Sequence, residues 1–203
     1  MIYICTHLEK PAYDLSCDCK IVDNNDTTFP DNIASKGNMY RHLRGVYNIY
    51  KNYKLEDEVG IFQNRRRLSQ FSIPEGYRAV VGKPFCIKQM IAQYSQCHHA
   101  EDIMIVKDIV NEPEFDEYLY KSPNYESYYD NMFIMNKQDF CNYCDFLFKT
   151  LFKFDEITGG RHYEEYQEAV NAFLGERIGS YWIWKNIPKN ELYLADRIQY
   201  PKV

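Results

Sequence analysis

The chain has 203 residues, of which 45% are hydrophobic and 26% charged, and its formal net charge is −5. Length and composition fit one globular domain with a substantial core, so we expect a single domain over residues 1–203. The negative charge disfavours a nucleic acid as partner, and no apolar run is long enough to suggest a transmembrane segment.

The first half of the chain alternates short apolar runs with polar segments. The apolar runs, rich in β-branched residues, predict strands at 1–5, within 14–22, at 59–62 and at 79–81. Apolar residues at helical spacing predict a helix from about Met39 to Asn52, with Asn38 as its N-cap. The first strand ends at Thr6-His7, and the strand at 59–62 leads into Gln63-Asn64-Arg65-Arg66-Arg67.

The second half is dominated by helical patterns around one apolar strand. Helices are expected at 87–94, 100–110, 137–154 and 164–184, and a Tyr-rich segment at 118–129 predicts a loop or irregular helix. Residues 131–135 predict a buried strand, entered through Asp130-Asn131 and left through Asn136. Strands interleaved with helices predict an α/β fold, with a mostly parallel sheet and helices on both faces.

The seven cysteines include two close pairs, Cys17-x-Cys19 and Cys141-x-x-Cys144. In a chain without a signal peptide, free thiols are expected rather than disulfides. The second pair lies in a helical pattern with no further ligand pair nearby, so thiols are expected there rather than zinc ligands. We therefore expect a soluble protein in a reducing, cytoplasmic compartment, and peripheral contact with a membrane-bound acceptor stays open.

Polar side chains stand where the predicted strands begin or end, and such positions line the ligand crevice of open α/β sheets. Thr6 and His7 could bond a base or a ribose, although a plain loop explains them too. Asn131 can bond sugar hydroxyls both as donor and as acceptor. The arginines at 65–67 could neutralise phosphate oxygens, and a solvated basic run is the alternative.

Five segments carry a family resemblance, and they occur in the family's order between residues 30 and 185. They are Asp31-Asn32-Ile33 with Tyr40-x-x-Leu43-x-x-x-Tyr47-x-x-Tyr50-Lys51-Asn52, Val59-Gly60-Ile61-Phe62-Gln63-Asn64-Arg65-Arg66, Gln93-Tyr94-x-x-Cys97-His98-His99-Ala100-Glu101-Asp102, Asn131-Met132-Phe133-Ile134-Met135 with Tyr143-Cys144-x-Phe146-Leu147-Phe148, and Phe173-Leu174-Gly175-Glu176-Arg177. Together they resemble a family of bacterial exopolysaccharide and capsular-polysaccharide glycosyltransferases. That family was long catalogued as a domain of unknown function, and galactofuranosyltransferase-type activities are associated with it.

The chain departs from the family pattern at four polar positions. A glutamate and a threonine of the family become His42 and Arg44, and a histidine and a tyrosine become Gln63 and Asn64. These changes mark a divergent member and bear on the donor sugar more than on the fold. A bacterial and a viral origin both stay open.

The resemblance implies a glycosyltransferase of the GT-A type, with a mixed, mostly parallel sheet flanked by helices and a Rossmann-like nucleotide-binding half. Such an enzyme moves a sugar from a nucleotide donor, here expected to be a UDP-sugar, to a hydroxyl of a glycan, glycolipid or glycoprotein. A catalytically inactive module that binds nucleotide or sugar is the alternative. The residues expected to bind the nucleotide sugar are Thr6, His7, Asn38, Arg65, Arg66 and Asn131.

Two carboxylates are candidates for the general base that deprotonates the acceptor. Asp130 stands at the mouth of a strand, whereas Glu176 lies beside Arg177 on an otherwise apolar helix and could instead form a structural ion pair. The chain has no Asp-x-Asp motif, so a Mn or Mg cofactor is uncertain, and Arg65 with Arg66 could take over part of its task.

His98 and Asp102 are weak candidates for metal ligands. Imidazole and carboxylate suit Mn or Zn, but the spacing in His98-His99-x-Glu101-Asp102 is not a standard zinc pattern. A polar helix start, with acidic residues favourable to the helix dipole, explains the cluster equally well.

Overall fold

The computed structural model describes residues 1–7, 11, 13, 19–86, 89–120 and 126–201. Its main element is an eight-stranded sheet in the order β10-β4-β3-β8-β5-β9, with β1 pairing with β3 and β2 pairing with β1. The strands are β1 (Ile2–Thr6), β2 (Cys19–Asp23), β3 (Glu58–Gln63), β4 (Arg66–Leu68), β5 (Ala79–Gly82), β8 (Phe133–Asn136), β9 (Leu192–Ala195) and β10 (Arg197–Gln199). A separate antiparallel pair joins β6 (Phe85–Cys86) to β7 (Glu126–Ser127).

The sheet is mixed, as predicted. Strand β1 runs parallel to both β2 and β3, and β5 runs parallel to β9. Strand β8 lies between β3 and β5 and is antiparallel to both. Because β8 is reversed, its first residues lie beside the last residues of β3, which brings Asp130 close to the arginines that follow β3.

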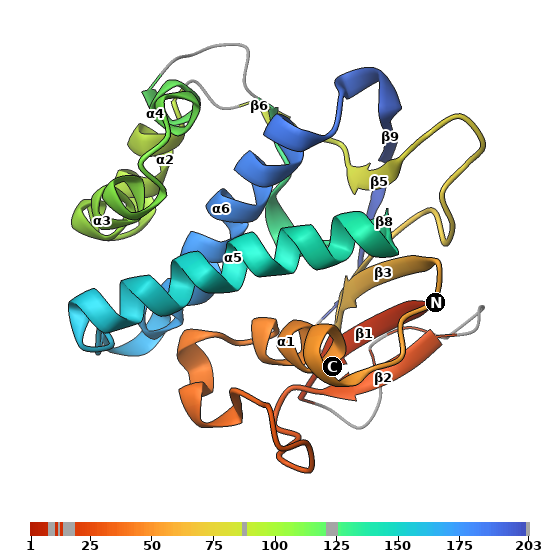
Figure 1. The fold of residues 1–203 in the computed structure, drawn as a ribbon, viewed down its shortest axis with the longest axis horizontal. Helices are drawn as coiled ribbons and strands as arrows, with labels where there is room; N and C mark the ends of the chain where they lie inside the picture. Colours follow the sequence, from red (N-terminus) through yellow and green to blue (C-terminus); the bar gives the residue numbers. More distant parts are fainter. Residues whose placement is uncertain (8–10, 12, 14–18, 87–88, 121–125, 202–203) are drawn as a thin grey trace.

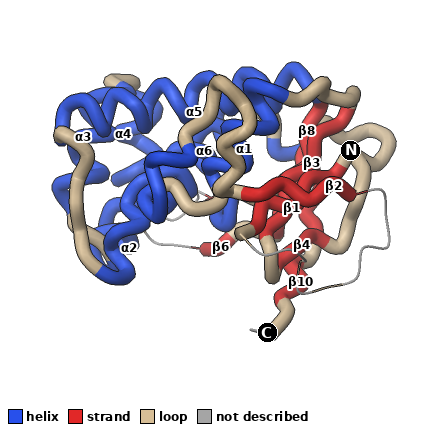
Figure 2. The backbone as a smooth tube through the Cα atoms, turned by 90° about the horizontal axis from the view of Figure 1, so that it is seen from below, coloured by secondary structure: helices blue, strands red, loops and turns tan. Residues whose placement is uncertain are grey.

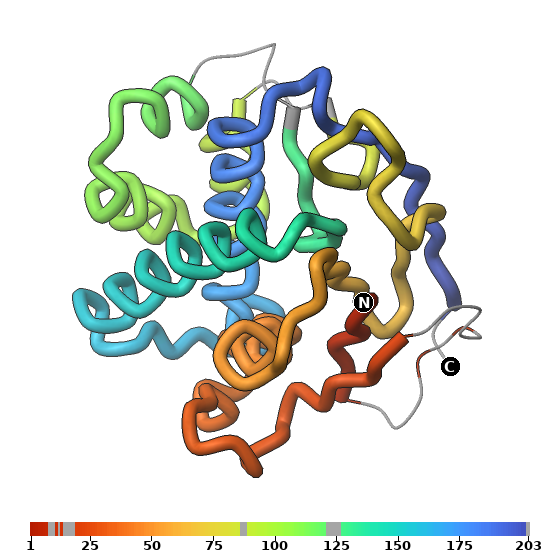
Figure 3. The backbone as a smooth tube through the Cα atoms, turned by 45° about the vertical axis from the view of Figure 1, so that its right-hand side comes forward, coloured from red at the N-terminus to blue at the C-terminus, as the bar shows by residue number. Residues whose placement is uncertain are grey.

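Helices pack against the sheet and against each other (Figure 1). They are α1 (Leu43–Asn52), α2 (Met90–Cys97), α3 (Ala100–Val110), α4 (Pro113–Tyr120), α5 (Lys137–Thr158) and α6 (Val170–Asn186). Shorter 3-10 turns are η1 (Ala34–Met39), η2 (Tyr129–Asn131), η3 (Glu165–Ala169) and η4 (Lys189–Glu191). The long helix α5 contacts both α1 and α6 and lies between them in Figure 1 and Figure 3.

Alternate residues of the central strands face two different cores. On β3, Val59 and Ile61 join the large core that the helices cover, whereas Phe62 belongs to a smaller cluster on the other face. In the described part of the chain, Phe71 and Ile73 help to cover that smaller cluster, and no helix does. The helices therefore lie on one face and not on both as expected, because antiparallel neighbours such as β3 and β8 need no crossover helix between them.

Most predicted elements are present, with shifted boundaries. Helix α1 begins at Leu43 and not at Met39, since Arg41 adopts a positive φ of 44° that interrupts the helical path. Asn38 is thus not an N-cap and lies inside η1. The helix expected at 164–184 is divided into η3 and α6. Helix α4, at 113–120, was not predicted and includes only the first three residues of the Tyr-rich segment expected at 118–129. Parts of the expected strand at 14–22 and helix at 87–94 lie outside the described residues.

The cysteine expectation is only partly correct. Cys5, Cys97, Cys141 and Cys144 are free, as expected, but Cys19 is disulfide-bonded. Among the described residues, no helix is both long and apolar enough to cross a membrane.

Candidate functional site

A cavity of about 920 Å³ opens beside the carboxyl ends of β1 and β3. Residues of α2 and α6 form its opposite wall, and Figure 2 shows these helices on one side and β1, β3 and β4 on the other. The lining residues are Cys5, His7, Asn24, Asn25, Asn38, Arg41, His42, Arg44, Gln63, Asn64, Arg65, Arg66, Phe85, Gln93, Cys97, His98, Tyr129, Asp130, Tyr166, Ala172, Phe173, Glu176 and Arg177.

The cavity is positively charged although the chain is acidic. Five arginines line it, against the two carboxylates Asp130 and Glu176, while the whole chain carries a net charge of −5. A concave site with an excess of one charge focuses the field and raises the local concentration of oppositely charged ligands. The site therefore favours an anionic ligand such as a phosphate ester.

Asp130 is held by two guanidinium groups. Its Oδ1 lies 2.7 Å from Nη1 of Arg66, and its Oδ2 lies 2.8 Å from Nε of Arg197 in β10. The backbone is pinned as well, because the side-chain amide of Gln63 donates to the Asp130 carbonyl. Asp130 adopts a φ of +82°, a strained conformation of the kind that clusters at functional sites.

Arg65 and Arg66 both line the cavity, as the sequence predicts, but they differ in their contacts. Arg66 is already paired with Asp130. Within the described part of the chain, the side chain of Arg65 makes no ion pair or hydrogen bond, so its guanidinium is available to a ligand. The next arginine, Arg67, does not line the cavity and lies over the rings of Phe71 and Tyr200.

Glu176 faces the cavity from α6 and is partly buried, with 22% of its side chain exposed. Its Oε2 lies 2.8 Å from Nη1 of Arg177, so the ion pair with Arg177 that the sequence suggested as an alternative is present. Burial raises the pKa of Glu176 above its usual range and Asp130 adds to the rise, whereas Arg177 lowers it. A carboxyl with a raised pKa is a better proton acceptor than an ordinary one.

Arg177 fixes the direction of the Glu176 carboxylate. Its other terminal nitrogen, Nη2, donates to Oε1 of Gln93 at 2.8 Å, and its guanidinium lies over the ring of Tyr129 at 4.6 Å. Because Arg177 is almost completely buried, these contacts limit its motion and that of its partner.

The other predicted ligand-binding residues are not all exposed to the cavity. His7 and Asn38 line it, and Asn38 also donates to Oε2 of Glu168 at 3.1 Å. Thr6 and Asn131 are buried and lie behind the lining residues. Asn131 accepts from the Tyr143 hydroxyl at 3.2 Å, so it supports the cavity wall rather than facing the cavity.

Side chains that could ligate a metal do not form a large cluster in the described residues. These residues contain no group of three or more His, Cys, Asp or Glu side chains that could hold a metal ion. His98 lines the cavity, but its Nδ1 lies 3.0 Å from Oε1 of Gln167. Asp102 is buried elsewhere, where it pairs with Arg161 at 3.3 Å and accepts from the Tyr163 hydroxyl.

Arg41 and His42 are among the lining residues that the sequence did not predict as site residues. The Nε2 atom of His42 lies 3.3 Å from Nδ2 of Asn131. Burial, together with the nearby charges of Arg41 and Arg66, lowers the pKa of His42 to about 4, so the ring is neutral at pH 7. The replacement of a family glutamate by His42 was the available signal, whereas nothing in the sequence marked Arg41.

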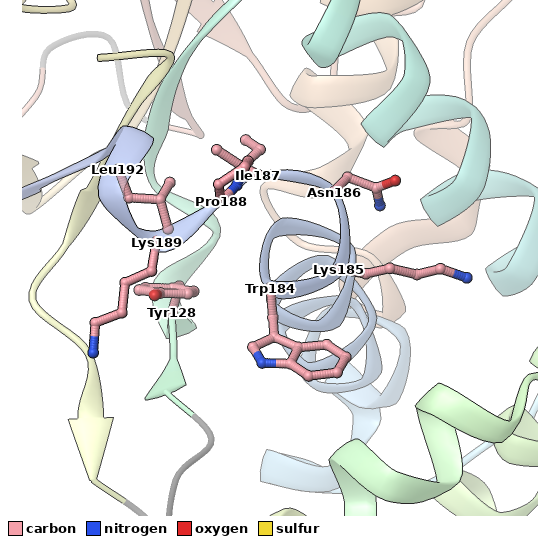
Figure 4. Close-up of a pocket in the computed structure, with 8 residues that line it drawn as sticks. All are labelled: Tyr128, Trp184, Lys185, Asn186, Ile187, Pro188, Lys189 and Leu192. Atoms are coloured by element: carbon pink, nitrogen blue, oxygen red, sulfur yellow. The ribbon is translucent and has the colours of Figure 1, made fainter. Parts of the chain in front are cut away.

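A second, smaller pocket of about 240 Å³ lies near the end of α6 (Figure 4). Tyr128, Trp184 and Leu192 are among its lining residues, and none of the predicted site residues reaches it. Those predicted residues that line either of these two pockets therefore all line the larger cavity.

Comparisons with known proteins agree with this architecture. The family model described as a domain of unknown function (DUF4422) matches residues 13–186. No curated protein matches the chain. Among solved structures, the apo structure of the bifunctional glycosyltransferase WbbM is similar over 99% of this chain, with a TM-score of 0.80 and 22% sequence identity.

This chain covers 45% of the WbbM chain, so the likeness concerns one part of a longer protein. At this identity it shows a shared fold, and the expected GT-A-like α/β architecture is confirmed. The family model spans most of the described chain and includes the segments that carried the resemblance. The protein therefore belongs to the DUF4422 family.

Proposed function

We propose that the protein transfers a sugar from a nucleotide-sugar donor, a UDP-sugar in the first instance, to a hydroxyl of a glycan acceptor. The observation that carries this proposal is the arginine-rich cavity at the carboxyl ends of β1 and β3, where ligands bind in open α/β sheets. The fold shared with a glycosyltransferase supports the same reaction class.

The diphosphate of the donor is assigned to Arg65, with Arg66 beside it. A departing nucleoside diphosphate gains negative charge, and guanidinium groups stabilise that charge through bidentate hydrogen bonds. Arg65 has no competing partner among the described residues, whereas Arg66 shares its charge with Asp130. No cluster of three or more metal-ligating side chains is present among the described residues, and we assign the neutralising role to these arginines.

Glu176 is the better candidate for the general base. Both oxygens of Asp130 are engaged by guanidinium groups, which leaves that carboxylate poorly placed to accept a proton. Only Oε2 of Glu176 pairs with Arg177 among the described residues, and burial raises the pKa of this carboxyl. It would accept the proton of the acceptor hydroxyl while the new C–O bond forms and the diphosphate leaves with its electron pair.

Asp130 is accordingly a positioning residue in this proposal. It joins Arg66, the first residue of β4, to Arg197, the first residue of β10. This arrangement would hold Arg66 at the cavity surface when the donor binds, and a pre-positioned charge needs less reorganisation during the reaction.

Calorimetric titration with UDP tests the proposal, using Arg65→Ala with Arg67→Ala as matched control. Both variants lose one arginine from the same segment, but only Arg65 lines the cavity. Loss of charge-assisted hydrogen bonds should weaken UDP binding about 10- to 100-fold in Arg65→Ala and leave Arg67→Ala near wild type. Equal affinity in both variants, or no UDP binding to the wild type, would contradict the assignment.

Donor turnover separates the enzyme from an inactive binding module. Incubation with a panel of UDP-, GDP- and dTDP-sugars, with and without Mn, should release nucleotide from one of them. Tight UDP binding without release or transfer would favour the inactive module, which the loss of the family's polar residues at His42, Arg44, Gln63 and Asn64 would then explain.

A further inference from the structure

Three aromatic rings form a continuous wall on the helical side of the cavity. His98 stacks on Phe173 with ring centroids 4.1 Å apart, and Tyr166 lies 4.8 Å from Phe173. All three rings line the cavity, yet Tyr166 is 58% exposed. A large ring left open at the edge of a concave site provides apolar surface for a ligand.

Arg41 projects over the same wall. Its guanidinium carbon lies 5.7 Å from the ring centre of Tyr166 and 5.4 Å from that of Phe173. Its φ is +44°, which is unusual for a long side chain, and its carbonyl accepts hydrogen bonds from the backbone and side chain of Arg44. No ion pair holds Arg41 within the described ranges, so the strained backbone presents a cation to whatever occupies the wall.

The aromatic wall borders the proposed general base. Phe173 and Glu176 are three residues apart on α6, so they lie on the same face of the helix. Arg41 is close enough to Glu176 to lower the pKa of that carboxyl. His7 and Arg65, by contrast, follow β1 and β3 on the strand side of the cavity. A donor bound to the strand side would leave the wall free on the other side of Glu176.

We propose that Tyr166, Phe173 and His98, together with Arg41, form the acceptor subsite of the enzyme. The terminal sugar of the glycan would place its C–H face on the Tyr166 ring, while the Arg41 guanidinium donates hydrogen bonds to its hydroxyls. This inference depends on the proposed glycosyl transfer, and it assigns the acceptor to a surface distinct from that of the donor.

A sugar fits this wall better than a second anion does. Burial lowers the pKa of His98, so its ring is neutral at pH 7 and contributes apolar surface without charge. A sugar has an apolar C–H face that can pack on the aromatic rings and hydroxyl groups at its edge that can accept hydrogen bonds from Arg41. A nucleoside base could also stack on Tyr166, and the experiment is arranged to separate these two occupants.

Saturation-transfer NMR with methyl β-D-galactopyranoside and methyl β-D-glucopyranoside tests the subsite directly. The wild type and Tyr166→Phe, which keeps the ring, should both transfer saturation to at least one of these sugars in the presence of saturating UDP. Tyr166→Ala should bind that sugar about tenfold more weakly, because the apolar contact is lost. Tyr166 is exposed, so all three proteins should share one melting temperature.

UDP affinity is measured on the same proteins and identifies the occupant. Unchanged UDP affinity in Tyr166→Ala supports an acceptor subsite, whereas a matching loss of UDP affinity would assign the wall to the nucleoside and overturn the inference. Three results of the NMR experiment would also overturn it. They are loss of the sugar signals on addition of UDP, sugar signals in Tyr166→Ala as strong as those in the wild type, and the absence of sugar signals from the wild type. Failure of the wild type to bind UDP would instead refute the proposed function itself.

Discussion

His42 makes the stability of the protein depend on pH in a direction that can be derived from its surroundings. Its pKa falls from 6.5 to about 4 through burial and through the nearby guanidiniums of Arg41 and Arg66. A histidine with a depressed pKa binds protons more tightly in the unfolded chain, so acid favours unfolding. Its stabilising contribution is complete above pH 6.5 and is lost progressively as the pH falls towards 4.

The size of this effect follows from the two pKa values. Between pH 7.5 and pH 5, the linkage relation predicts a loss of about 2 kcal/mol in the free energy of unfolding, as an upper value for a partly exposed group. The hydrogen bond between His42 and Asn131 also favours the neutral ring. A neutral Nε2 can accept from the Asn131 amide at 3.3 Å, whereas a protonated ring would present a second donor.

Urea denaturation of the wild type, His42→Gln and His162→Gln at pH 7.5 and pH 5 measures the contribution. Glutamine can still accept from Asn131 but does not titrate, and His162 is an exposed histidine that serves as the control. The wild type and His162→Gln should lose up to about 2 kcal/mol more than His42→Gln between the two pH values. Equal losses in all three proteins would refute the reasoning.

Three further substitutions test other parts of the site and its support. Glu176→Gln should abolish sugar transfer while UDP affinity stays within about threefold of the wild type. Because burial raises the pKa of this carboxyl, its ionisation lowers the stability of the folded protein. The melting temperature of Glu176→Gln should therefore exceed that of the wild type by more at pH 8 than at pH 5. Asp130→Asn should lower the free energy of unfolding by about 3 kcal/mol in urea titrations, since two guanidiniums lose their shared carboxylate, and a wild-type value would contradict the clamp. Gly179→Ala places a Cβ 2.3 Å from the Tyr143 hydroxyl and should cost about 1–3 kcal/mol by the same measurement; unchanged stability would show that Tyr143 moves aside freely.

Local patterns were sufficient for several central strands and the longest helix, whereas the short strands β4, β9 and β10 were not predicted. The apolar run from Val59 to Phe62 predicted β3, and the apolar stripe beginning near Phe140 predicted α5, because such runs and periods are properties of neighbouring residues. The structure adds that Asn136 caps α5, where its side-chain oxygen accepts from the backbone N–H of Asp139. The start of α1 was missed, since nothing local foretold the positive φ of Arg41.

Part of the candidate site was also predictable. Arg65, Arg66 and Glu176 were identified from their positions next to a strand end or beside a charged neighbour, and all three line the cavity. Asp102 was placed in the metal candidates because its residue type suits the chemistry, yet it is buried against Arg161. Chemical suitability alone does not distinguish a ligand from a satisfied structural carboxylate.

The sequence by itself determined the class of fold, the family and the strand ends at which polar side chains gather. Those features depend on residues close together along the chain. Only the tertiary structure decided the roles of these side chains, because the reversed direction of β8 and the return of β10 bring Asp130 between Arg66 and Arg197. Contacts across such distances depend on strand order and direction, which no local pattern encodes.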